Sequence, residues 1–264
     1  MSDPGHPAGD APTTPAASGP GALGELHATT AERPRARALV LLDPRRAFLA
    51  VRARPLAALL FAIMLGFALL PPLTFVMKVD TAALLERELK RSGKLEQVPP
   101  EQLEQMRSIG GTAMTVMLPV AAAGKRAGFI FVVTALAFLL LRGSKPELRF
   151  GTTVAAVSLA CAPAALHDVA AALTFLVKDP MGLADAQNVV QSNPAAWFAL
   201  DTGRSVTGAF LHGLDFFSLW TCGLAAVGIN VVAGARSVIP WAVTFGLHAT
   251  FVGLSMIGPA VQGG

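Results

Sequence analysis

Tyrosine is absent from this chain of 264 residues, and charged residues make up only 14% of it, against about 25% in a typical soluble domain. Hydrophobic residues make up 53% and gather in long blocks. This composition excludes a disordered chain, an ordinary nucleic-acid-binding domain and a typical soluble enzyme. The two cysteines, Cys161 and Cys222, form no CxxC pair, so we expect neither a disulfide framework nor a thiolate metal site. We therefore predict an all-α fold, a polytopic helical membrane bundle.

The first 38 residues are predicted to be a disordered cytoplasmic tail that precedes a membrane domain over residues 39–264. Residues 1–30 contain five Pro, five Gly and six Ala, and little that could form a core. Seven arginines then approach the first apolar block, where residues 38–42 and 47–51 could form a short interfacial helix. Asp43-Pro44 would start its second half, because proline suits the first turn of a helix.

About five membrane spans are predicted from the apolar blocks. The first has 23 residues and no charge, which gives about 34 Å of helix, enough to cross a bilayer core. Pro71-Pro72 should kink or end it, and Lys125 and Arg126 inside the second span should snorkel to the interface. The polar loop 78–111 is predicted to be an extramembrane helical hairpin that turns at Ser92-Gly93. The expected spans are residues 55–77, 112–141, 150–177, 207–235 and 237–262.

Orientation is predicted from the basic residues. The arginines before the first span usually dominate orientation, and the first loop between spans is nearly neutral. We therefore expect the N-terminus in the cytoplasm and, with an odd number of spans, the C-terminus outside.

Five ionisable residues inside the expected spans are the candidate functional residues. A charge at mid-bilayer costs at least about 3 kcal/mol, so such residues suggest function. They could converge on a metal or a proton path, whereas packing and capping are the structural alternatives. His212 and Asp215 are spaced to share one helix face, and Asp215 could cap a helix or pair with Arg204. The residues are His167, Asp168, His212, Asp215 and His248.

Known catalytic and ligand-binding patterns are missing from the sequence. It contains no HExxH, no Gly-x-Ser-x-Gly and no phosphate-binding loop. We therefore expect no enzyme activity, no metal ligands and no cofactor, and we favour structural roles for the five residues.

A resemblance to a known family arises in the fourth span. Asp215, Phe217 and Trp220 match an Asp-x-Phe-x-x-Trp-like helix entry, and Pro163 and the Asp43–Phe48 stretch match other family positions. The chain resembles bacterial members of the Yip family, membrane proteins named for interaction with Ypt/Rab GTPases. The resemblance implies a five-span protein of the bacterial cytoplasmic (inner) membrane with a cytoplasmic N-terminal tail. The eukaryotic signatures contain tyrosine, which this chain lacks, so Rab-type binding is not carried over.

Three functional hypotheses follow. The first is a non-enzymatic membrane scaffold or organiser that contacts membrane lipids and either a protein partner or a second copy of the chain, but no nucleic acid. The second is a small ion- or proton-coupled transporter that uses the five ionisable residues. The third, a membrane metalloenzyme, needs the same residues to converge. If the five ionisable residues lie in one cavity, the transporter and metalloenzyme hypotheses are favoured. If they are spread over several helix interfaces, the scaffold hypothesis is favoured.

Overall fold

The computed structural model describes residues 41–79, 83–84, 86, 89–90, 99–178, 189–200, 202 and 205–262. The chain divides into two units, Met1–Arg35 and Ala36–Gly264, and every described residue belongs to the second. The expected tail, the expected turn at Ser92-Gly93 and Arg204 lie outside the described residues.

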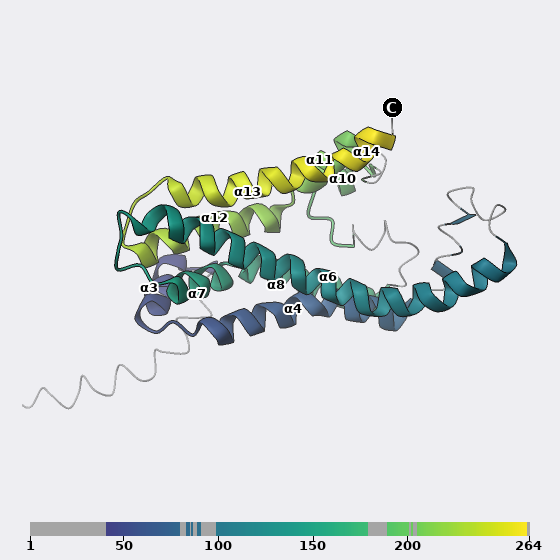
Figure 1. Cartoon of the computed structure of the whole chain (residues 1–264), viewed down its shortest axis with the longest axis horizontal. Helices are drawn as coiled ribbons and strands as arrows, with labels where there is room; N and C mark the ends of the chain where they lie inside the picture. The colour runs from purple at the N-terminus through teal and green to yellow at the C-terminus, as the bar shows by residue number, and fades with distance from the viewer. Residues whose placement is uncertain are drawn as a thin grey trace, which may run out of the picture. The chain divides into compact units, whose positions relative to one another are not determined.

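The described residues form helices and no strand, as predicted. Four helices are long and apolar enough to cross a membrane, or five spans result if the bent pair α7–α8 counts as one. The all-α membrane bundle of about five spans is therefore confirmed (Figure 1). The helices are α3 (Pro44–Ala53), α4 (Ala57–Lys78), α6 (Pro100–Arg142), α7 (Phe150–Ala160), α8 (Ala162–Val177), α10 (Pro194–Trp197), α11 (Val206–Gly213), α12 (Phe216–Ala233), α13 (Ile239–Ser255) and α14 (Ile257–Gln262).

Helix α6 corrects the expected hairpin. The second arm of the expected hairpin and the expected second span instead form one continuous helix of 43 residues, Pro100–Arg142, which runs through Pro119. Such a helix is about 64 Å long, twice the roughly 30 Å hydrocarbon core. Only Met114–Arg142 is apolar enough to be a candidate span, and the start of α6 extends past the ends of the other long helices (Figure 1).

Two expected spans are interrupted. Residues 150–177 form α7 and α8, which are bent by 41° at Cys161, and Pro163 lies in the first turn of α8, where its missing N–H costs nothing. The prediction of one helix over 207–235 is wrong, because the chain leaves the helix at Leu214 and Asp215 starts α12. Pro71-Pro72, by contrast, do not end α4, which continues to Lys78.

The centre of the bundle is α7, in which every residue from Thr152 to Ala160 is buried. Helices α4, α6, α12 and α3 all contact it. Its sequence is rich in Ala, Thr and Ser, whose small side chains let neighbouring backbones approach closely. A helix that is apolar all round belongs in the interior, and α7 is in that position.

The short helix α3 is docked on the bundle. Its first turn begins at Pro44, as expected, and the Asp43 carboxylate accepts a hydrogen bond of 3.1 Å from the Arg46 backbone N–H. Ala47, Phe48 and Val51 form its buried face, and the Phe48 ring occupies the space beside Gly228 of α12. A Cβ at Gly228 would lie 2.7 Å from this ring, so the glycine is required for the close approach.

One end of the bundle, which we call the basic end, is rich in cations. It consists of α3 and the turns that join α6 to α7 and α12 to α13; residues from all three segments line one cleft. In the described part of this end, the acidic residues are Asp43 and Glu147. Its basic residues are Arg45, Arg46, Arg52, Arg54, Arg142, Lys145, Arg149 and Arg236.

Candidate functional site

An ion pair between two membrane helices is the centre of the candidate site. The Arg126 guanidinium of α6 donates a hydrogen bond of 2.7 Å to the Asp168 carboxylate of α8. Each side chain is only 13% exposed, so the two charges compensate each other inside the bundle. The prediction that Arg126 snorkels is therefore wrong, whereas its neighbour Lys125 is exposed.

His167 extends this contact toward α12. Its Nδ1 atom lies 3.9 Å from the Asp168 carboxylate, and its ring meets the Phe217 ring edge-on with centroids 5.4 Å apart. Phe217 belongs to the first turn of α12, so the histidine connects α8 with that turn.

Asp215 joins the 189–200 segment to the start of α12. One carboxylate oxygen accepts a 2.7 Å hydrogen bond from the Ser218 backbone N–H, and the other accepts one from the Ser192 hydroxyl. The Phe216 N–H also donates to the Ser192 carbonyl, at 3.0 Å. Asp215 therefore caps α12, which is one of the two structural roles expected for it.

The two remaining histidines lie around the end of α11. His248 of α13 places Nε2 2.9 Å from the Gly213 carbonyl oxygen, which holds α11 against α13. His212 is half-buried, and its buried Nδ1 has no hydrogen-bond partner among the described residues. Burial lowers the pKa of His212 below 6.5, and the positive charge of Lys125 lowers it further against the opposing effect of Asp215.

His212 and Asp215 do not share a helix face, because the break at Leu214 separates them. Arg126 is about 24 Å along α6 from Arg142, and Asp215 about 28 Å along α12 from Gly234. Arg126 and Asp215 therefore lie far from the basic end.

The structure divides the five candidates among separate contacts. Asp168 pairs with Arg126, Asp215 caps α12, and His248 binds a carbonyl of α11. In the part of the chain that the structure describes, no three His, Cys, Asp or Glu side chains lie close enough to hold a metal ion.

Arg126 and Ser192 were not among the candidates that the sequence suggested. Arg126 could have been found, since an arginine inside a span needs a partner and Asp168 was an available carboxylate. Ser192 carries no such signal, because its role depends on a loop folding back onto α12.

The residues of the Asp-x-Phe-x-x-Trp entry have visible structural roles. Asp215 caps the helix, Phe217 packs on His167, and Trp220 packs on Phe216 with ring centroids 5.5 Å apart. Pro163 is fully buried at the start of α8.

A family model described as the Yip1 domain matches residues 38–257. The chain belongs to the Yip1 domain family. It is thus an integral, multi-pass membrane protein of the Yip type, and no curated protein and no solved structure matches it.

Proposed function

We propose that this Yip-type protein is a non-enzymatic membrane scaffold or organiser, which acts through contacts with lipids and a partner. The proposal rests on the contacts that the ionisable residues of the bundle make between its segments. Arg126–Asp168 joins α6 to α8, Asp215 joins the 189–200 segment to α12, and His248 joins α11 to α13. These contacts stabilise one arrangement of the helices, which is what a scaffold requires.

The proposal includes an orientation in a bacterial inner membrane. The basic end would face the cytoplasm, because basic residues are retained on that side. Eight basic residues against two acidic ones in the described part of this end support this orientation. The N-terminal segment would then be cytoplasmic, and α14 would lie at the outer side.

The start of α6 is the surface that we propose for a protein partner or a second copy. It would extend beyond the bilayer, and its polar residues Glu101, Gln102 and Glu104 are exposed. A helix held by its membrane half presents such side chains at a fixed distance from the surface.

Photo-crosslinking in cells tests the partner contact. A photoreactive residue replaces Gln102, and as a matched control the same residue replaces Leu139, which is 68% exposed on the membrane half of α6. We expect a protein adduct of discrete mass, including a dimer of the chain itself, at position 102 only. Adducts to lipid alone at both positions would contradict the scaffold proposal.

A transporter is the second candidate, favoured by one observation. Arg126 Nη1 and His212 Nδ1 are buried without a hydrogen-bond partner among the described residues, and such groups could bind a transported ion. Purified wild type and the Asp168→Asn, His212→Ala and Asp215→Asn variants are reconstituted in liposomes that contain a pH-sensitive dye. Proton flux in wild type that is lost in folded Asp168→Asn and His212→Ala would replace the scaffold proposal, whereas we expect flux equal to that of protein-free liposomes.

A further inference from the structure

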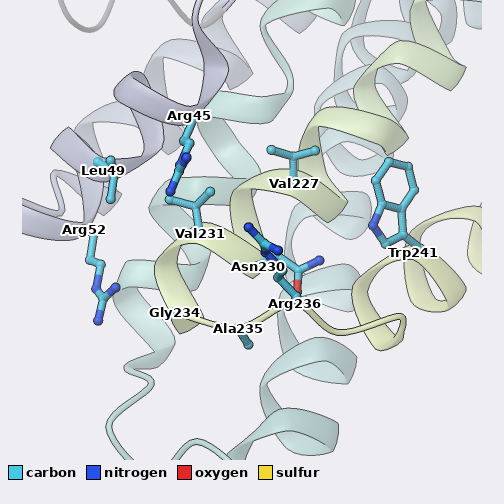
Figure 2. Close-up of a pocket in the computed structure, with 10 residues that line it drawn as sticks. All are labelled: Arg45, Leu49, Arg52, Val227, Asn230, Val231, Gly234, Ala235, Arg236 and Trp241. Carbon is cyan, nitrogen blue, oxygen red and sulfur yellow. The ribbon is translucent and has the colours of Figure 1, made fainter.

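A cleft at the basic end combines three arginines with an apolar wall. It has a volume of about 540 Å³ and lies between α3, the end of α12, the following turn and the start of α13. Figure 2 shows Arg45 and Arg52 on α3 beside the end of α12, Arg236 in the turn and Trp241 on the other side. Because α12 ends at Ala233 and α13 begins at Ile239, the cleft lies at the turn between two candidate spans.

The positive charge of this cleft is not compensated by the described part of the chain. Arg46 approaches Asp43 and Arg126 binds Asp168, but no carboxylate of the described residues forms a salt bridge with Arg45, Arg52 or Arg236. Guanidinium groups bind phosphate oxygens with paired, charge-assisted hydrogen bonds. An external anion with a phosphate group therefore fits the cleft.

The turn that carries Arg236 is held in place. The Asn230 side chain donates to the Ser237 carbonyl at 3.0 Å and accepts from the Ser237 N–H at 2.9 Å. Gly234 has a positive φ of 60°, and a Cβ there would lie 3.2 Å from the Arg52 guanidinium. The glycine therefore both ends α12 and leaves room for Arg52, so the arginines face a preformed site.

The apolar wall distinguishes a lipid from a free phosphate. Leu49 and Trp241 are 45% and 42% exposed, and Val227 and Val231 of α12 line the cleft between them (Figure 2). Tryptophan at this depth is typical of the lipid headgroup region. A small inorganic anion would leave this wall uncovered, whereas the glycerol and first acyl carbons of a phospholipid would cover it.

We propose that the cleft binds the phosphate headgroup of an anionic glycerophospholipid from the leaflet at the basic end. Basic pockets between membrane helices bind such headgroups in other proteins. The inference goes beyond the scaffold proposal and would hold equally for a transporter, since it depends only on the cleft and its membrane position.

Binding of phosphatidylglycerol to the purified full-length chain, counted by native mass spectrometry, tests the proposal. The variants are Arg45→Gln, Arg236→Gln and their double, and the matched control is Arg46→Gln, the next residue on α3, which lies outside the cleft. Arg46→Gln keeps the helix cap because that bond uses the backbone N–H. We expect one tightly retained lipid, about tenfold weaker binding in each single variant as for the loss of a charge-assisted contact, and a change below about twofold in the control.

Competition distinguishes the sources of the phosphate. Phosphatidylcholine and inorganic phosphate are added in separate experiments, and we expect neither to displace phosphatidylglycerol. Equal loss of binding in Arg46→Gln, equal retention of phosphatidylcholine, or displacement by inorganic phosphate would each overturn the proposal.

A second measurement uses wild-type protein in case the arginine variants do not fold. A phosphatidylglycerol with a photoreactive group near the glycerol is crosslinked in nanodiscs, and the labelled peptides are mapped. Labels in residues 45–52 and 227–241 would support the site. Labels spread evenly over the lipid-facing helices, without enrichment there, would refute it.

Discussion

At the scale of single residues, the Arg126–Asp168 pair carries the largest expected energetic effect. Both side chains are 13% exposed, so removal of one partner leaves the other charge buried without compensation. Loss of one partner of a buried pair costs more than replacement of both by apolar side chains of similar size. The effect on stability of replacing one of the two residues therefore depends on the other, which lies 42 residues away in the sequence.

Asp168→Asn should lower the free energy of unfolding by about 3 kcal/mol, because Arg126 then remains charged and unpaired. The double variant Arg126→Met/Asp168→Leu should be more stable than either single variant, because no buried charge is left. Denaturant titration of the purified proteins in detergent measures both quantities. Additive losses in the double variant would show that the pair does not interact energetically.

His212 should make stability depend on pH. Its pKa is lowered below 6.5 in the folded protein by burial and by Lys125, whereas the unfolded chain binds a proton near 6.5. Below that pH the unfolded state binds more protons, so stability should fall as pH decreases from about 6.5 toward the folded pKa. The difference in unfolding temperature between pH 7.5 and pH 5.5 should be smaller in His212→Asn than in wild type. An unchanged difference would contradict this assignment.

The sequence predicted the residue-scale features that depend on near neighbours, and missed those that depend on distant ones. Asp43 and Asp215 could be assigned as helix caps because Pro44 and the aromatic residues after Asp215 mark the helix starts. The partners Arg126 and Ser192 lie 42 and 23 residues from their carboxylates. Such pairings are set by how helices pack, which local patterns do not contain.

At the scale of helices, close approach of α3 to α12 depends on a glycine. The Phe48 ring fills the space where a Cβ of Gly228 would lie, whereas a Cβ at Gly223, on the same helix, would meet nothing within 4 Å. The two positions therefore separate packing from helix propensity, since alanine gains the same propensity at both.

Gly228→Ala should destabilise the protein by about 1–3 kcal/mol, the usual cost of overpacking a tight contact. Gly223→Ala should leave stability unchanged or slightly raise it. Thermal unfolding in detergent compares the two, and trypsin cleavage after Arg46 and Arg52, both within α3, should accelerate only in Gly228→Ala because α3 loosens. Equal behaviour of the two variants would show that the contact is not required.

The helix boundaries show why spans are harder to predict than membrane location. Hydropathy found the apolar blocks, but it did not separate α11 from α12, since Leu211, Leu214 and Phe216 keep the block apolar across the break. It also placed a boundary before residue 112, where the polar start of α6 continues as helix. Hydropathy indicates whether lipid or water surrounds a helix, whereas backbone hydrogen bonds and caps determine where the helix ends.

At the scale of the whole molecule, the proposed orientation can be tested by labelling. Cys161 and Cys222 are buried, so new cysteines can be read against a low background. In intact bacterial cells, a membrane-impermeant maleimide should label Gln191→Cys, and Ser144→Cys should be labelled only after lysis, because Ser144 belongs to the basic end. The reverse pattern would place the basic end outside, and labelling of both positions in intact cells would contradict a single orientation.

The buried position of α7 has a consequence for biosynthesis. Helices α4, α6 and α7 leave the ribosome well before α12, which forms one wall around α7. Until α12 arrives, the part of the α7 surface that it later covers is open to lipid or to the insertion machinery. A chain that stops before residue 216 therefore keeps an unfinished interior, and membrane quality-control proteases should recognise it as incomplete.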